Sequence, residues 1–205
     1  MDNTKVSMER AMSTNTYKDE AKLMRGRHST VFITGDTVIK IFPQSLFQNF
    51  WKEVKYLSML QSSGFVPKLY EFNALNLEIK MEYVRGVIIK KWINTADYDE
   101  IIDVLRSCMD ICRKLDEMRI QKEEMNHPDK HIIVQPGRIV FIDFERAHSS
   151  VHPKNVTQFL MYLSKIGIVR IYPDIIEKMR EYKRKLDSRS YMMLKKSIFP
   201  KAGEG

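Results

Sequence analysis

The first half of the chain alternates apolar and polar residues in short runs, which is the pattern of half-buried β-strands. Residues 31–34 and 37–42 are two such runs, and the two residues between them include a glycine. This spacing predicts a tight antiparallel hairpin. Residues 68–72 and 77–84 repeat the alternation around an asparagine-rich turn. Together these runs predict a small antiparallel sheet.

A helical period follows the first hairpin. Phe50, Val54 and Leu57 recur at spacings of four and three residues, which predicts a helix over residues 45–61. Ser45 is the expected N-cap, because its hydroxyl can accept a hydrogen bond from a free backbone amide. We expect the sheet and this helix to share one hydrophobic core.

The second half of the chain is mainly helical in pattern. Apolar residues recur at helical spacing over residues 98–118, 155–166 and 174–196, whereas residues 122–130 show no period. A second hairpin is expected over residues 132–142, around a Pro-Gly turn. The expected fold class is therefore α+β in two lobes, a small sheet with one helix and then a helical lobe with a β-hairpin.

Helix starts are indicated at three further places. Asn155 is followed by Gln158 three residues later, which resembles a capping box. Pro173 stands at a position that suits the first turn of the last helix. A short helix is expected over residues 6–12.

Composition narrows the class of protein. The chain has 205 residues, of which 43% are apolar and 29% are charged, as in ordinary globular proteins. No apolar run approaches the ~18–20 residues of a membrane span, and the first twenty residues lack the apolar region of a secretory signal. Cys108 and Cys112 lie one helical turn apart, which favours core positions over a disulfide framework or a metal site. We expect a cytoplasmic protein.

The charge is unevenly distributed. The net charge is +8, and residues 165–201 contain eleven lysines and arginines against four acidic residues. A basic end beside a nearly neutral body indicates an anionic partner at that end. A solvated helix face is the alternative interpretation.

Three ionisable residues occupy positions where packing would favour apolar ones. Lys40 lies within the strand of residues 37–42, Glu53 lies on the helix face of Phe50 and Leu57, and Asp143 ends an apolar strand. Because an isolated buried charge is costly, such residues are usually paired or bind a ligand. A lysine paired with a helix glutamate can hold a polyphosphate, and an aspartate at a strand end can hold its Mg²⁺.

In this order, these residues resemble the protein kinase superfamily over about residues 24–147. Residues 38–40 match the strand lysine motif, Glu53 matches the helix glutamate, and Ile-Asp-Phe-Glu at 142–145 replaces the D-F-G pattern with D-F-E. The resemblance implies that Lys40 and Glu53 act at the phosphates and that Asp143 binds the metal ion.

The resemblance also implies contacts for the rest of a nucleotide. The phosphate-covering loop would include Gly26, Ser29 and Val31, although only the middle glycine of G-x-G-x-x-G-x-V is present. The backbone carbonyl of Glu82 and the amide of Val84 would meet the adenine in an inter-lobe hinge.

The catalytic loop departs from the family pattern, which is H-x-D, four residues and then Asn. In one register His131 takes the Asn position and the Asp position becomes Asn126, an amide that cannot accept a proton. In the other register Glu124 takes the Asp position, so Glu124 is the preferred general base and Asp129 the second candidate. Lys130 would neutralise the γ-phosphate. His131 would bind the metal, favouring Mn²⁺, or hydrogen-bond to the base.

The short chain resembles minimal archaeal kinases, similar to the RIO kinases and the kinase of the KEOPS complex. Only 62 residues follow Asp143, and no A-P-E motif is present. P-x-K-H at 128–131 and N-V-T at 155–157 resemble a group of archaeal Ser/Thr kinases. A single kinase-like domain is expected, with its parts at residues 17–84 (amino lobe), 82–86 (hinge) and 87–200 (carboxyl lobe).

The resemblance implies an atypical Ser/Thr protein kinase that uses ATP and Mg²⁺, or Mn²⁺, between its lobes. An ATPase acting within an assembly and a nucleotide-binding pseudokinase are alternatives from the same fold. A small-molecule kinase of aminoglycoside-phosphotransferase type would need a larger substrate lobe. RIO and KEOPS kinases work beside RNA, so an RNA-containing partner is expected at the basic end. The rival from another class is a basic RNA-binding module without phosphotransfer.

Overall fold

The computed structural model of the chain describes residues 22–25 and 28–200, which fall into two compact units. The first unit comprises the described residues up to Gly86 together with Val140–Arg146. The second comprises Val87–Ile139 and the described residues from Ala147 onward. The short helix expected over residues 6–12 lies outside the described residues.

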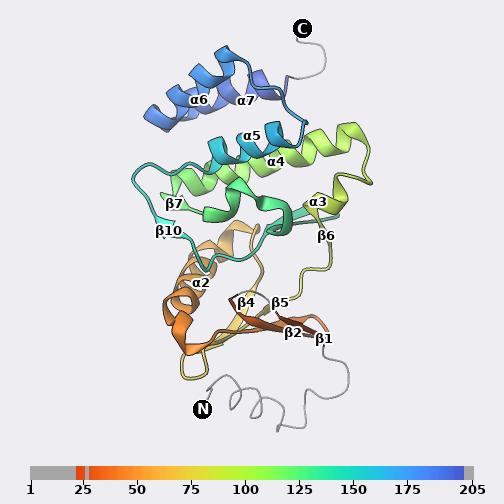
Figure 1. Cartoon of the computed structure of the whole chain (residues 1–205), viewed down its shortest axis with the longest axis vertical. Coiled ribbons are helices and arrows are strands. Elements are labelled where there is room, and N and C mark those ends of the chain that lie inside the picture. Colours follow the sequence, from red (N-terminus) through yellow and green to blue (C-terminus); the bar gives the residue numbers. More distant parts are fainter. Residues whose placement is uncertain (1–21, 26–27, 201–205) are drawn as a thin grey trace. The chain divides into compact units, whose positions relative to one another are not determined.

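The first unit is built on a five-stranded antiparallel sheet with the strand order β1-β2-β3-β5-β4 (Figure 1). Both expected strand pairs are confirmed, and the first hairpin turns at Gly35, whose φ of 56° suits a glycine. Strand β1, at one edge of the sheet, was not expected from the sequence. The strands are β1 (Lys22–Arg25), β2 (Thr30–Thr34), β3 (Thr37–Ile41), β4 (Leu69–Asn73) and β5 (Glu78–Glu82).

Helix α2 (Phe47–Leu60) supplies the core of this unit. Phe50 and Leu57 are fully buried, as the helical period predicts. The expected cap at Ser45 is wrong, because Ser45 lies inside a 3₁₀ turn, Gln44–Leu46, that precedes the helix. The N-cap is Leu46, which makes no side-chain cap.

The segment Val140–Arg146 belongs to the first unit although it is distant in sequence. The backbone amide of Phe141 donates to the carbonyl of Phe65 at 2.7 Å, and the two rings meet edge to face at 6.3 Å. Phe141 and Phe144 are both fully buried. These contacts anchor the segment on both sides of Asp143.

The second unit is mainly helical and has two short sheets, ordered β10-β7 and β6-β8-β9. The end of strand β9 belongs to the first unit. No helix in the described ranges is long and apolar enough to cross a membrane. The helices are α3 (Ile89–Trp92), α4 (Tyr98–Glu117), α5 (Asn155–Lys165), α6 (Pro173–Lys185) and α7 (Ser188–Ile198). The strands are β6 (Val87–Ile88), β7 (Ile120–Gln121), β8 (Ile132–Gln135), β9 (Arg138–Phe141) and β10 (His148–Ser149), and 3₁₀ turns span Glu123–Asn126 and Pro128–Lys130.

The single helix expected over residues 174–196 is wrong, since the structure has two helices there (Figure 1). Leu186 adopts a left-handed conformation with φ of 48°, which ends α6. Asp187 then caps α7, because its Oδ1 accepts a hydrogen bond from the amide of Ser190 at 2.7 Å.

The expected capping box at Asn155 is also wrong. Asn155 is the first residue of α5, and its backbone and side-chain nitrogens donate to Asp116 Oδ1 at 3.0 and 2.7 Å. Its own Oδ1 accepts from the amide of Lys122 at 2.9 Å. Gln158 accepts from the side chain of Gln121 at 2.8 Å instead of bonding back to the helix start. Asn155 therefore ties α5 to α4 and to the loop after β7.

Candidate functional site

A buried lysine forms the centre of the candidate site in the first unit. Lys40 lies on β3, between Val31 of β2 and Ile79 of β5, and is only 7% exposed. Its Nζ lies 2.9 Å from Asp143 Oδ1 and 3.7 Å from Glu53 Oε1. The structure therefore brings together the three residues that the sequence singled out.

A third carboxylate also contacts this lysine, since Glu145 Oε2 lies 3.1 Å from Lys40 Nζ. Burial by itself lowers the pKa of an ammonium group, but the charges of Glu53, Asp143 and Glu145 outweigh it. The pKa of Lys40 is consequently raised well above its ordinary value. Lys40 is thus a permanent cation in a cluster of negative charge.

Glu53 is held in the hydrophobic core. It is 1% exposed and lies on the face of α2 that buries Phe50 and Leu57. A carboxylate in this position is tolerated when a cation compensates it, and Lys40 provides that charge. The helix thereby places a buried carboxylate beside the lysine.

Asp143 follows β9 and has a left-handed backbone, with φ of 67°. Aspartate adopts this conformation more readily than most residues, but the conformation still stores local strain. Its side chain is 30% exposed, in contrast to the lysine that it contacts. The carboxylate is therefore accessible to a ligand while it remains attached to Lys40.

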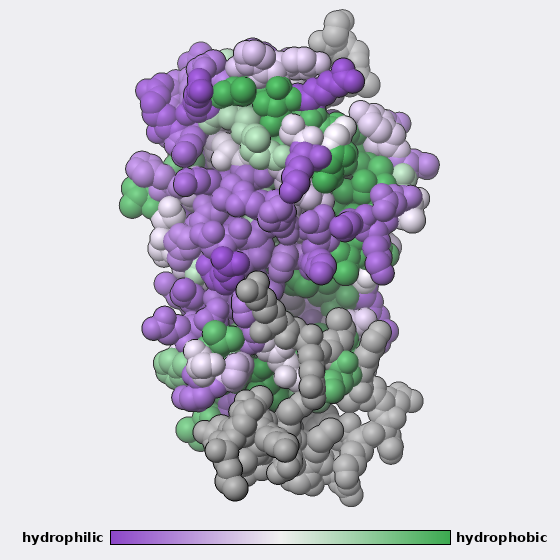
Figure 2. Space-filling view, viewed as in Figure 1, coloured by the Kyte–Doolittle hydropathy of each residue, from purple (hydrophilic) through white to green (hydrophobic). Residues whose placement is uncertain are grey.

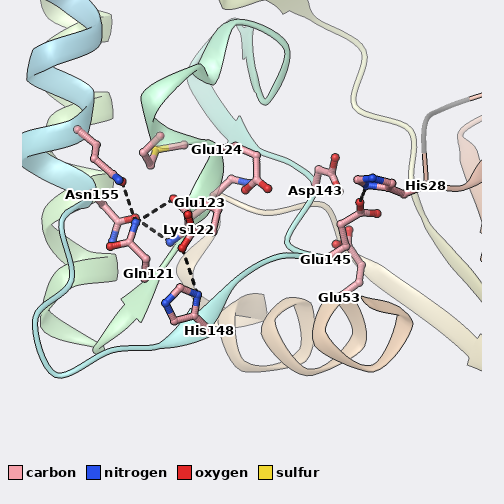
Figure 3. Close-up of polar contacts among 12 residues, drawn as sticks. His28, Glu53, Gln121, Lys122, Glu123, Glu124, Asp143, Glu145, His148 and Asn155 are labelled. Atoms are coloured by element: carbon pink, nitrogen blue, oxygen red, sulfur yellow. Dashed lines mark hydrogen bonds and ion pairs between the residues drawn. The ribbon is translucent and has the colours of Figure 1, made fainter. Parts of the chain in front are cut away.

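A histidine, His28, completes this cluster, which the sequence did not predict. His28 Nδ1 lies 2.5 Å from Glu145 Oε1 (Figure 3). Figure 3 shows Glu53 and Asp143 near His28 and Glu145. The sequence signals were the Glu in D-F-E and a histidine within the expected phosphate loop.

In the second unit, the loop after β7 contains a buried ion pair. Lys122 is fully buried and its Nζ donates to Glu124 Oε2 at 2.9 Å (the two residues are labelled in Figure 3). Glu124 Oε1 is also buried, and among the described residues it has no hydrogen-bond partner. One oxygen of Glu124 is thus held by a cation and the other is free to accept a proton.

The sequence did not predict a role for Lys122, although it contains a signal for one. If Glu124 takes the Asp position of H-x-D, then Lys122 takes the His position. The Lys122 backbone amide donates to Asn155, as described above, so the start of this loop is attached to α5.

The other candidates of this loop lie in less suitable surroundings. Asp129 Oδ1 accepts a hydrogen bond from the Tyr162 hydroxyl at 3.0 Å, which occupies one of its oxygens. Lys130 and Asn126 are exposed, and His131 follows the second 3₁₀ turn with partial exposure. Within the described ranges, no group of three or more His, Cys, Asp or Glu side chains is arranged to hold a metal ion by itself.

The residues expected to contact the rest of a nucleotide are placed only in part. Gly26 lies outside the described residues, while Ser29 and Val31 are half-buried. Glu82 ends β5, and its Oε2 accepts from the amide of Lys68 at 3.0 Å. Val84 is buried.

The cysteines behave as core residues. Cys108 and Cys112 are both free and buried on α4, and burial raises the pKa of each thiol. Neutral thiols in an apolar environment are poor nucleophiles and poor metal ligands.

Comparison with known proteins gives a structural likeness without a sequence match. No protein-family model and no curated protein matches the chain. The Rio2 kinase of Chaetomium thermophilum, solved as an ADP/Mg²⁺–phosphoaspartate complex, superposes with a TM-score of 0.57 at 15% identity, covering 95% of this chain and 66% of that one. A second Rio2 kinase structure from this organism gives 0.55 at 14% identity, with coverage of 95% and 67%.

WbdD, solved with the kinase inhibitor LY294002, gives a TM-score of 0.61 at 15% identity, covering 87% of this chain and 45% of that one. The chain thus spans between about half and two thirds of the length of these proteins. At such identities the likeness concerns the fold alone. The chain has an α+β, protein-kinase-like fold.

Proposed function

We propose that this protein binds Mg²⁺-ATP and transfers the terminal phosphoryl group to a Ser or Thr hydroxyl of a protein. The observation that carries the proposal is the convergence of Glu53 and Asp143 on the buried ammonium of Lys40. An RNA-binding module without phosphotransfer has no use for this cluster, whereas a polyphosphate site requires a fixed cation and a carboxylate for the metal.

The chemistry of the donors fits a magnesium ion. Mg²⁺ is usually bound in such sites by one or two protein carboxylates, water and the phosphates of the substrate. Asp143 would be the first of these ligands, because its carboxylate is partly exposed. The ion would neutralise charge that develops on the phosphate oxygens during transfer.

The reaction is a displacement at the γ-phosphorus. The substrate hydroxyl oxygen forms a bond to the γ-phosphorus, the bond to the oxygen bridging the β- and γ-phosphates breaks, and ADP leaves. Lys40, oriented by Glu53, would bind phosphate oxygens. Glu124 would accept the hydroxyl proton, because its Oε1 is free while Lys122 holds its other oxygen.

Two outcomes of the same nucleotide site differ only in the acceptor. If water replaces the hydroxyl, the protein is an ATPase that acts within an assembly. If no acceptor reacts, it is a nucleotide-binding pseudokinase.

ATP radiolabelled at the γ-phosphate distinguishes these outcomes. Label in the protein or in an added protein substrate supports the kinase, and release of inorganic phosphate alone supports the ATPase. Asp143→Ala should abolish either activity. Nucleotide binding without transfer or release would identify a pseudokinase and would contradict the proposed transfer.

A further inference from the structure

Glu145 makes two short contacts that tie distant parts of the first unit together. Its Oε2 lies 3.1 Å from Lys40 Nζ on β3, and its Oε1 lies 2.5 Å from His28 Nδ1, two residues before β2 (Figure 3). Its side chain is 4% exposed. A histidine ring nitrogen that carries a proton donates to a carboxylate in both the neutral and the cationic ring. Each carboxylate oxygen of Glu145 therefore has a partner of its own.

The contact with Lys40 uses the group that a phosphate would need. An ammonium has three hydrogens to donate, and Lys40 faces the three carboxylates of Glu53, Asp143 and Glu145. A phosphate oxygen would seek the same donors at about 2.7–2.9 Å. The Glu145 charge also repels an approaching phosphate, and this repulsion is strong where water is excluded.

We propose that Glu145 is an intramolecular competitor for Lys40 and thereby sets the affinity of the nucleotide site. A nucleotide phosphate displaces the Glu145 carboxylate from the ammonium, while Glu53 and Asp143 keep their places. This inference rests on the nucleotide site of the proposed function and adds a residue that limits it.

The proposed exchange involves the Glu145 side chain and leaves its neighbour in the core. Phe144, directly before Glu145, is fully buried. The Glu145 side chain would rotate away from Lys40 when a phosphate takes its place. His28 is partly exposed, with 34% of its side chain accessible, so it can follow the carboxylate.

The test compares binding of Mg²⁺-ATP by calorimetry in the full chain and in Glu145→Gln. Glutamine keeps the size of the side chain but removes the charge that attracts Lys40 and repels phosphate. Because hydrogen bonds to charged groups are stronger than neutral ones, we expect binding on the order of tenfold tighter. Glu71→Gln is the matched control, since Glu71 is an exposed carboxylate paired with Lys80 on the same sheet, at 3.2 Å. It should bind as the unaltered chain does.

A second variant, Glu145→Gly, provides an independent measurement in case Glu145→Gln does not fold. Glu145→Gly restores the D-F-G pattern, and it should also bind more tightly than the unaltered chain. Equal or weaker binding by Glu145→Gln and Glu145→Gly, in folded protein, overturns the inference. Weaker binding that recovers at high Mg²⁺ would instead identify Glu145 as a metal ligand.

Failure of the nucleotide site itself has a different signature. If Lys40→Met binds Mg²⁺-ATP as well as the unaltered chain does, the proposed function is wrong, whatever Glu145 does. If the unaltered chain binds too weakly to measure, a gain of binding in Glu145→Gln supports the competitor role, and no gain overturns it.

Discussion

At the scale of single residues, two buried clusters each combine a lysine with one or more carboxylates. Lys40 contacts the carboxylates of Glu53, Asp143 and Glu145, and Lys122 contacts that of Glu124. Removing one member of a buried pair leaves an uncompensated charge, which typically costs about 3–5 kcal/mol. The two clusters therefore differ from exposed ion pairs, which contribute little to stability.

Glu124→Gln tests the identity of the general base. The variant should retain its affinity for Mg²⁺-ATP and lose about 10²–10⁴-fold in phosphoryl transfer, because an amide cannot accept the proton. Transfer and binding are measured on the same folded preparation. Asp129→Asn is the matched comparison and should have a mild effect. A severe loss in Asp129→Asn together with a mild loss in Glu124→Gln would mean that the register of this loop is wrong.

Lys122→Met tests the ion pair through stability. Because Glu124 is left buried without its cation, the free energy of unfolding in urea should fall by about 3–5 kcal/mol. The double variant Lys122→Met/Glu124→Gln should recover much of that loss, since both charges are then absent. If the loss of unfolding free energy in the double variant equals the sum of the losses in the two single variants, the residues do not interact.

At the scale of elements, hydrogen bonds from buried side chains hold the helices of the second unit together. Asp116 at the end of α4 accepts from Asn155 of α5 and, at 2.7 Å, from the Tyr182 hydroxyl of α6. Burial raises the pKa of Asp116, an effect that these donors oppose. One aspartate thus connects three helices.

Asn155→Ala should weaken this junction. It removes the side-chain hydrogen bonds of Asn155 to Asp116, to the carbonyl of Ile120 and from the amide of Lys122. Each buried polar group that is left unsatisfied costs about 1–3 kcal/mol. Chemical denaturation should show this loss. Thr157→Ala is the control on the same helix, because the Thr157 hydroxyl donates to the carbonyl of Lys154, at 3.1 Å, and not to Asp116. Equal losses in both variants would contradict the special role of Asn155.

The sequence predicted those elements whose signals are local. Both hairpins were found, because alternation with period two and a short glycine-containing turn specify them. The break at Leu186 was missed, since a left-handed leucine has no local signature and the apolar period continues past it. Asn155 was misread as a cap because its true partner, Asp116, lies 39 residues away in sequence.

The residues of the candidate site were also predictable only in part. Lys40, Glu53 and Asp143 could be found because a charge in an apolar pattern is visible in sequence. Glu145 and His28 could not be assigned, because a contact between residues 117 positions apart depends on the folded chain.

At the scale of the whole molecule, positive charge gathers on the last two helices. Figure 2 shows hydrophilic residues over the surface where Figure 1 draws α6. Within α6, Lys178 and Lys185 pair with acids of the same helix, at 3.1 and 2.6 Å. The exposed basic residues of this surface are Arg180, Lys183, Arg184, Lys185 and Arg189.

Charge reversal tests an RNA partner at this surface. Lys183→Glu/Arg184→Glu/Lys185→Glu should lose retention on RNA at low salt, because phosphate contacts release counterions. The control reverses three exposed lysines elsewhere in the second unit: Lys90, Lys91 and Lys114. Retention that is unchanged in the triple variant, or absent in the unaltered chain at ~0.1 M salt, would leave α6 as a solvated helix.

Calorimetric titration tests most directly the proposal that Lys40 and Asp143 form a site for Mg²⁺-ATP. The unaltered chain should show saturable binding that requires Mg²⁺, and Lys40→Met and Asp143→Asn should each weaken or abolish it. Lys80→Met, which removes a lysine from the neighbouring strand β5, should bind as the unaltered chain does. Binding that is unchanged in Lys40→Met or in Asp143→Asn would contradict the account.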